Sequence, residues 1–259
     1  MKPSVEIAER RARVAGLEVL LREAGDTPIL YLHGVPTAGW DWEPFLARTG
    51  GVAPDLPGFG ASAKPGDFDY SIPGYADFLE AFCADAGLGG VSLVMHDWGA
   101  VGLALAQHRP QLVDRIVLTG CVPFLPGYRW HRVARAWRTP VVGELTMGFT
   151  TRFGFRRSLP RQIADRAYDA FDQGTQRAIL RLYRSSPPEV LAAHGERLGE
   201  LRCPALVLWP THDPYIGAEF GRRYADALGG DVELEPIDAG HWPWLDRPEV
   251  VDRVAAFLG

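Results

Sequence analysis

Four polar residues in this sequence lie where predicted strands end, and their types could support hydrolysis through a covalent intermediate. They are His33, Asp97, Asp213 and His241. In open parallel sheets, ligands bind beyond the carboxyl ends of the strands. We therefore expect these side chains to meet at one edge of a sheet.

Asp97 is the predicted nucleophile. The apolar run 93–96 leads into Asp97-Trp98-Gly99-Ala100 and then directly into a helical pattern, which is typical of a strand-turn-helix elbow that lifts its central side chain clear of the sheet. A carboxylate that attacks an sp3 carbon displaces a leaving group and forms an alkyl-enzyme ester. The simpler alternative for Asp97 is a helix-capping role.

Asp213 and His241 complete the order nucleophile, acid, base. His241 would activate water to attack the Asp97 ester, and Asp213 would hold the imidazole in the required tautomer. An Asp before Pro214 is also a common turn former. Asp238, three residues before His241, is the nearest rival for the acid.

The second step needs two backbone N–H donors for its oxyanion. Trp98, the residue after the nucleophile, is expected to supply one and Val35 the other. Pro36 has no N–H and cannot serve.

The motifs that carry these residues resemble the alpha/beta-hydrolase branch of epoxide hydrolases and haloalkane dehalogenases. They are His33-Gly34-Val35-Pro36, His96-Asp97-Trp98-Gly99, Asp213-Pro214 and Gly240-His241-Trp242. The resemblance covers almost the whole chain. It implies an α/β-hydrolase fold, a mostly parallel central sheet flanked by helices, with a helical cap inserted after the sixth strand.

The resemblance leaves two leaving groups open, and we favour an epoxide hydrolase with haloalkane dehalogenase as the alternative. Epoxide hydrolases use cap tyrosines as acids, and Tyr183 stands in a similar context, whereas Tyr128 and Tyr168 do not align clearly. Dehalogenases hold the halide with indole N–H groups and often with the side chain of an Asn that follows His-Gly. This sequence has Val35 at that position.

The candidate indole donors are Trp98, Trp130 and Trp137. Tryptophans in helices are more often core residues, which is the simpler interpretation of the two in the cap. Met95 at the elbow favours a dehalogenase. A non-catalytic binding protein on the same fold is a remote alternative, which the intact set of Asp97, Asp213 and His241 disfavours.

The elements that must position these residues alternate strand and helix, except over one segment. Helical patterns near 128–137, 162–171, 176–183 and 189–201 interrupt the alternation after residue 123. We predict an α/β-hydrolase core at 1–123 and 204–259 and a helical cap at 124–203. This cap segment carries a net charge of +7, against −5 for the whole chain.

Composition excludes several classes of protein. The acidic balance, with a pI near 5.8, argues against nucleic acid as a partner. The glycine-rich residues 58–63 do not open a helix, as a dinucleotide-binding site must, so we expect no cofactor. The remaining histidines lack the spacing of metal ligands, so we expect no metal; they are His108, His131, His194 and His212.

The sequence also bears on location and partners. Three cysteines with no paired spacing and an N-terminus without a signal-peptide pattern or membrane span predict a cytoplasmic protein. The expected partner is a small apolar epoxide or halogenated substrate. Homo-oligomerisation stays open.

Overall fold

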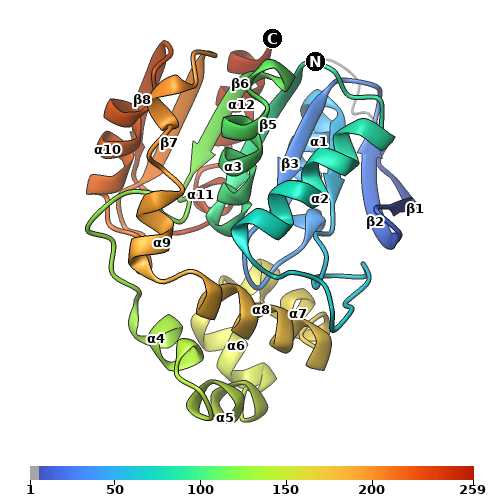
Figure 1. Cartoon of the computed structure of the whole chain (residues 1–259), viewed down its shortest axis with the longest axis vertical. Coiled ribbons are helices and arrows are strands. Elements are labelled where there is room, and N and C mark those ends of the chain that lie inside the picture. The colour runs from blue at the N-terminus through green and yellow to red at the C-terminus, as the bar shows by residue number, and fades with distance from the viewer. Residues whose placement is uncertain (1–5) are drawn as a thin grey trace.

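A sheet of eight strands forms the centre of the molecule in the computed structural model, which describes residues 6–259 (Figure 1). The strand order is β1-β2-β4-β3-β5-β6-β7-β8. The β1–β2 and β2–β4 pairs are antiparallel and the other neighbours are parallel. The strands are β1 (Ala8–Val14), β2 (Leu17–Ala24), β3 (Ile29–Leu32), β4 (Gly51–Pro54), β5 (Val91–His96), β6 (Val113–Thr119), β7 (Ala205–Pro210) and β8 (Val232–Ile237).

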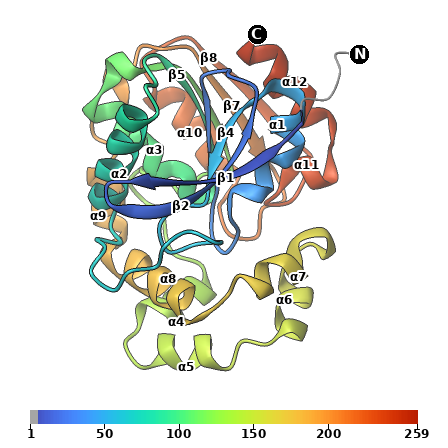
Figure 2. The same cartoon turned by 90° about the vertical axis from the view of Figure 1, so that its right-hand side faces the viewer.

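Helices cover both faces of the sheet, which confirms the predicted fold class. Figure 2 shows α2 (Ile72–Asp85) and α3 (Val101–His108) on one face and α1 (Glu43–Thr49) and α12 (Glu249–Leu258) on the other. The core contains two more helices, α10 (Glu219–Ala227) and α11 (Pro243–Asp246). Because helices cover both faces, every residue of β3, β5 and β7 is buried, as expected of inner parallel strands.

Six α-helices lie between the sixth and seventh strands, beyond the carboxyl ends of the sheet (Figure 1). They are α4 (Arg132–Arg138), α5 (Val142–Gly148), α6 (Arg152–Ser158), α7 (Arg161–Asp169), α8 (Gln173–Ser185) and α9 (Pro188–Ala193). The insertion after the sixth strand agrees with the expected fold. The division at residues 124 and 203 into core and cap stays a prediction, and "cap" below denotes this segment.

The cap differs in detail from its sequence pattern. The helix expected at 128–137 begins only at Arg132, because His131 caps it by accepting a hydrogen bond from the Ala134 N–H. The helix expected at 189–201 ends at Ala193, and α5 and α6 were not expected at all. Within residues 6–259, no helix is long and apolar enough to cross a membrane.

A buried ion pair connects the sheet to the loops at its carboxyl edge. Arg22 on β2 lies 2.6 Å from the Asp55 carboxylate, and the Asp55 side chain is fully buried. The same carboxylate accepts hydrogen bonds from the backbone N–H groups of Gly39 and Ala61. Asp55 therefore ties together the loops that follow β3 and β4.

We expect Asp55→Ala to lower the free energy of unfolding by about 3–5 kcal/mol, because Arg22 loses its only buried carboxylate partner and keeps only the more exposed Glu9 and Glu43, while the amides of Gly39 and Ala61 lose their acceptor. Urea unfolding measures the change. Asp252→Ala is the control, since it removes an ion pair with Arg48 whose side chains are both exposed to water. Equal losses for the two variants would contradict the role of Asp55.

Candidate active site

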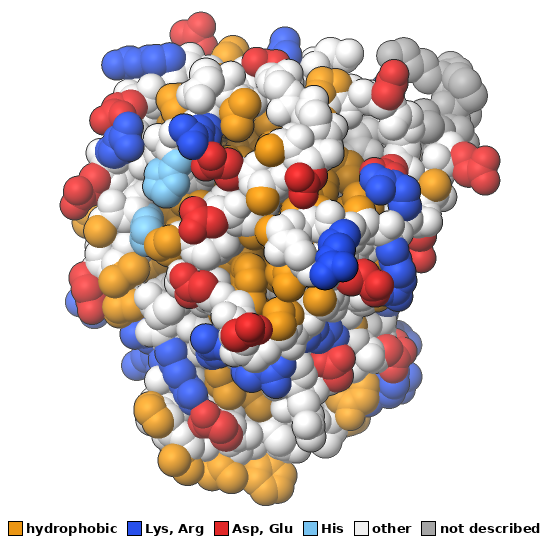
Figure 3. Space-filling model, turned by 45° about the vertical axis from the view of Figure 1, so that its right-hand side comes forward, with side chains coloured by type: hydrophobic (Ala, Val, Ile, Leu, Met, Phe, Trp, Pro, Cys, Tyr) orange, Lys and Arg blue, Asp and Glu red, His pale blue; other side chains and the backbone are white. Residues whose placement is uncertain are grey.

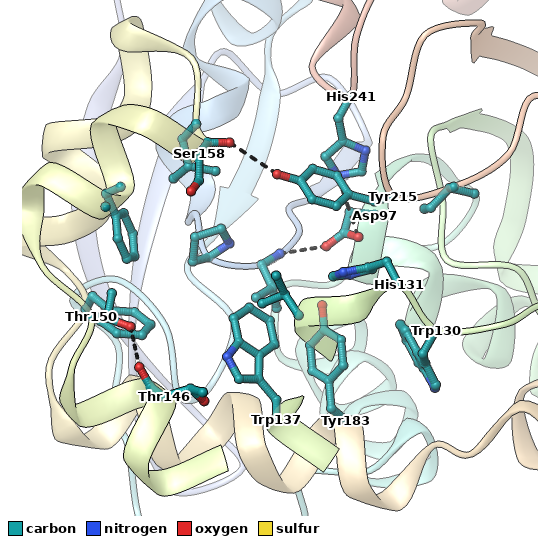
Figure 4. A pocket seen from close by; sticks show the side chains of 18 of the residues that line it. Asp97, Trp130, His131, Trp137, Thr146, Thr150, Ser158, Tyr183, Tyr215 and His241 are labelled. Atoms are coloured by element: carbon teal, nitrogen blue, oxygen red, sulfur yellow. Dashed lines mark hydrogen bonds and ion pairs between the residues drawn. The ribbon is translucent and has the colours of Figure 1, made fainter. Parts of the chain in front are cut away.

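Asp97 lies at a sharp turn between β5 and α3. Its φ angle is +49°, a left-handed conformation that costs free energy for a residue with a Cβ atom. A short 3-10 turn, Asp97–Ala100, follows and continues into the helix. The turn directs the carboxylate away from the sheet into a cavity below it (Figure 4).

Two glycines allow the chain to pack closely around this turn. A Cβ atom on Gly34 would lie 2.4 Å from the Asp97 Cβ, and one on Gly99 would lie 2.1 Å from the Leu32 carbonyl oxygen. Real Cβ atoms do not approach other atoms so closely. Both positions therefore require glycine for the strand end at Leu32 to contact the elbow.

His241 lies between two carboxylates. Its Nδ1 donates to Asp213 Oδ2 at 2.6 Å, and its Nε2 lies 3.7 Å from Asp97 Oδ2. The other oxygen of Asp213 accepts from the backbone N–H groups of Tyr215 and Ile216, which fixes that carboxylate. The three side chains of the predicted triad therefore meet.

The rival acid does not reach the site. Asp238 is exposed and bonds His212 and Arg247 instead of His241.

Burial and charge move the pKa values of the central pair in the same direction. Burial raises the pKa of Asp97, although the His241 charge and the amides of Val35 and Trp98 oppose the rise. Burial lowers the pKa of His241, but the charges of Asp213 and Asp97 outweigh it and leave the pKa above the ordinary 6.5. Asp97 is thus a poorly solvated carboxylate beside a basic imidazole.

Both predicted oxyanion donors face the Asp97 carboxylate. The Val35 N–H donates to Asp97 Oδ1 at 2.8 Å. The Trp98 N–H also favours the ionised carboxylate and so acts against the rise in its pKa. These amides can stabilise negative charge on an oxygen in this position.

Two further histidines hold the surrounding loops. His33 Nδ1 donates to the Gly34 carbonyl and its Nε2 accepts from the Leu56 N–H, and burial lowers its pKa to about 4. His96 Nε2 donates to the His241 carbonyl, and burial lowers the pKa of His96 well below 6.5. Both are neutral at pH 7 and hold neighbouring loops by hydrogen bonds.

The cavity has a volume of about 290 Å³ and lies between the elbow and the cap. Tyr183 on α8 lines it, and Figure 4 shows its hydroxyl directed toward Asp97. Burial and the Asp97 charge raise the pKa of Tyr183 well above 10, so the hydroxyl keeps its proton. It can therefore donate a hydrogen bond into the cavity.

The three tryptophans differ in what their indole N–H groups contact. The Trp98 Nε1 is buried and makes no hydrogen bond within residues 6–259. The Trp98 indole nevertheless lies close to the Tyr183 hydroxyl and opposes the rise in the pKa of Tyr183. The Trp130 N–H is engaged with the Ser186 carbonyl at 3.0 Å, so Trp130 contributes an apolar wall rather than a donor. Trp137 lines the cavity beside Tyr183.

Two cavity residues have no strong signal in the sequence. His131 lines the cavity, and because its Nδ1 caps α4, its neutral form carries the proton on Nε2. Burial lowers its pKa to about 4. Tyr215 packs its ring against His241 and donates its hydroxyl to the Ser158 carbonyl of α6.

Neither position could be recognised from spacing, because each depends on how the cap folds over the core. Tyr128 also lines the cavity, whereas Tyr168 does not. Within the described part of the chain, His, Cys, Asp and Glu side chains form no group of three that could hold a metal ion.

The comparisons with known proteins agree with this geometry. The model of the alpha/beta hydrolase family matches residues 29–254. The chain is similar to a haloalkane dehalogenase of Bradyrhizobium diazoefficiens, with 29% identity over 99% of this chain and 95% of that protein. It is also 32% identical to haloalkane dehalogenase 1 of Mycobacterium tuberculosis, over 75% of this chain and 70% of that protein.

A solved structure is similar to this chain over nearly its whole length. The crystal structure of haloalkane dehalogenase DbeA from Bradyrhizobium elkani superimposes with a TM-score of 0.83 and 28% identity, covering 98% of each chain.

We expect the His241 imidazole to titrate with a midpoint above 6.5. Asp213→Asn should lower that midpoint, because the carboxylate charge that stabilises the imidazolium is lost. NMR of the imidazole ring protons measures both values. Asp238→Asn is the matched control and should leave the midpoint unchanged, and a midpoint that moved with Asp238 instead of Asp213 would reverse the assignment of the acid.

Proposed function

This chain belongs to the alpha/beta hydrolase family, in the dehalogenase-like branch with an Asp nucleophile, and from that premise we propose that it is a haloalkane dehalogenase. The observation that carries the proposal is the Asp97 carboxylate at the elbow, bonded by the Val35 amide and facing the His241–Asp213 pair. The activity named for its relatives favours a halide over an epoxide as the leaving group.

In the first step, an Asp97 oxygen forms a bond to the carbon that carries the halogen. The carbon–halogen bond breaks, its electron pair leaves with the halide, and an alkyl ester of Asp97 results. The burial that raises the pKa of Asp97 also removes water from the carboxylate. A poorly solvated carboxylate is a better nucleophile toward an apolar substrate.

In the second step, His241 removes a proton from water, and the oxygen attacks the ester carbonyl carbon of Asp97. The oxyanion that forms is stabilised by the amides of Val35 and Trp98. Its collapse releases the alcohol and restores the carboxylate, and His241 returns its proton to solvent. The balance is haloalkane plus water to alcohol, halide and a proton.

The leaving halide needs hydrogen-bond donors near the reacting carbon. We assign this role to the Trp98 indole N–H, which has no other partner among the described residues, and to the adjacent Tyr183 hydroxyl. Trp130 is excluded from it because its N–H is already bonded. Val35 stands where many dehalogenases have an Asn and offers no side-chain donor, so the tyrosine takes that part.

Epoxide hydrolysis is the second candidate, and one observation favours it. The Tyr183 hydroxyl, which stays protonated, points from α8 toward Asp97 and could protonate an alkoxide as an epoxide ring opens (Figure 4). The nucleophile and base would act in the same way in both reactions.

The cavity bears on substrate size. Its volume of about 290 Å³ and largely apolar lining suit a small apolar molecule. We propose that residues 124–203 act as the cap that closes this cavity and sets which substrates fit.

His241→Gln should trap the covalent intermediate, because the ester forms without the base but its hydrolysis slows by roughly 1,000-fold or more. After incubation with bromohexane, intact-protein mass spectrometry should detect one hexyl group on Asp97. His212→Gln, at an exposed histidine, is the control and should accumulate no adduct. The absence of any adduct with bromohexane and with epoxyhexane would refute both enzymatic proposals and leave a binding protein.

Tyr183→Phe separates the two leaving groups. If the Tyr183 hydroxyl donates a hydrogen bond to the halide, its loss should slow ester formation from bromohexane by about tenfold at most. If the Tyr183 hydroxyl protonates the alkoxide of an epoxide, its loss should slow ring opening by roughly 100-fold or more.

Rapid-quench measurement of adduct formation gives both rates for Tyr183→Phe. Tyr168→Phe, in the cap but outside the cavity, controls for a lost hydroxyl. Wild-type turnover of epoxyhexane without turnover of bromohexane would reject the dehalogenase in favour of the second candidate.

A further inference from the structure

The large apolar side chains that are exposed in residues 6–259 all lie on one part of the cap. They are Val133, Val141, Val142, Leu145, Phe149 and Phe153, here called the cap-tip patch. Phe149 is 80% exposed and Phe153 is 74% exposed. Figure 3 shows apolar side chains gathered at this end of the molecule, over α5.

The segment that carries the patch is rich in basic residues. Between residues 129 and 161 the sequence has eight Arg and a single acidic residue, Glu144. Glu144 is already paired with Arg184. The segment is therefore strongly positive, although the whole chain carries −5.

Several of these arginines have no carboxylate partner. Arg129, Arg132, Arg135, Arg157 and Arg161 are exposed and form no ion pair within the described residues. Arg132 and Arg135 lie on α4 on either side of Val133, and Arg157 lies one turn after Phe153 on α6. Unpaired positive charges thus lie next to Val133 and Phe153 of the patch.

The patch also adjoins the mouth of the cavity. Val133 and Phe149 belong to the patch and also line the cavity. Thr146, Thr150 and Gly154, from the same segment, line the cavity as well. Figure 4 shows Thr146 and Thr150 on the side of the cavity remote from His241. A surface that covered the patch would therefore face the entrance.

We propose that the cap-tip patch docks on the surface of an anionic lipid bilayer. Exposed aromatic and aliphatic side chains can enter the boundary between headgroups and acyl chains, and the surrounding arginines can pair with anionic headgroups. The acidic core, on the far side of the cap, would be held away from the membrane. The rest of the chain offers no spanning helix within residues 6–259, so the attachment is peripheral.

Charge decides between the bilayer and a second copy of the chain. In a symmetric dimer formed through this patch, each cap would place its unpaired arginines against those of the other cap. Like charges in one interface oppose association, whereas an anionic membrane neutralises them. The bilayer also matches the apolar centre and basic rim of the patch together.

Docking of the patch on a bilayer does not depend on the reaction. The advantage that docking would give the enzyme rests on the proposed function. Small haloalkanes partition into the hydrocarbon of a membrane. A cavity whose mouth lies at the bilayer surface would take them from there rather than from water.

Sedimentation with vesicles tests the proposal on the full-length protein without any substrate. Vesicles of phosphatidylcholine with about 30% phosphatidylglycerol should bind the protein, and pure phosphatidylcholine vesicles should bind it far less. Leu145→Ser combined with Phe153→Ser should reduce the partition coefficient at least about tenfold. Neither residue lines the cavity, so the variant does not alter the site.

The charge requirement is tested separately. Arg132→Gln combined with Arg135→Gln should also lower binding about tenfold, and added salt should have the same effect. The matched control, Arg13→Gln with Arg222→Gln, removes the same charge from β1 and α10 of the core, outside residues 124–203, and should bind as the wild type does.

Three outcomes would overturn the proposal: no binding to anionic vesicles, binding that the cap variants do not change, or a lipid-free dimer that Leu145→Ser with Phe153→Ser dissociates. The last would identify a second copy as the occupant. None of these results depends on turnover of a haloalkane.

Discussion

The strained turn at Asp97 is the constraint on which the rest of the site depends. A non-glycine residue keeps a φ of +49° only where its surroundings fix it, and here β3 and its following loop lie against the turn with no room for a Cβ at Gly34 or Gly99. The Val35 amide then bonds the carboxylate directly. Strand β5 therefore positions the Asp97 side chain, and the loop after β3 supplies the amide that bonds its Oδ1, whereas Oδ2 is the oxygen that faces His241.

Histidines within this region have opposite electrostatic roles because their partners differ. His33 and His96 are fully buried and hydrogen-bond backbone groups, so burial outweighs the charges near them, both remain neutral, and they act as hydrogen-bonding links between loops. His241 has carboxylates on both sides, and these raise its pKa in spite of burial. Formation of an ester on Asp97 would remove one of those charges and make the imidazole less basic during the second step.

The core could be predicted from the sequence more fully than the cap. Apolar runs that end at His33 or Asp97 identify buried parallel strands, and strand ends meet at one edge for geometric reasons that hold in any such sheet. The cap helices α5 and α6 escape prediction because they are short and largely exposed, so no apolar stripe marks them. His131 and the bonded Trp130 N–H depend on how those helices pack, which no local pattern records.

The contacts between cap and core are unevenly distributed. Arg166 pairs with Glu43, Lys64 with Asp172, and Tyr215 bonds Ser158. By contrast, residues 139–157 form no hydrogen bond or ion pair with the core in the described part of the chain, and are held by other cap residues such as Arg184. Displacement of this segment would break hydrogen bonds and ion pairs within the cap alone. The polar contacts that align the sheet and the triad are thus separate from those that hold residues 139–157 over the cavity.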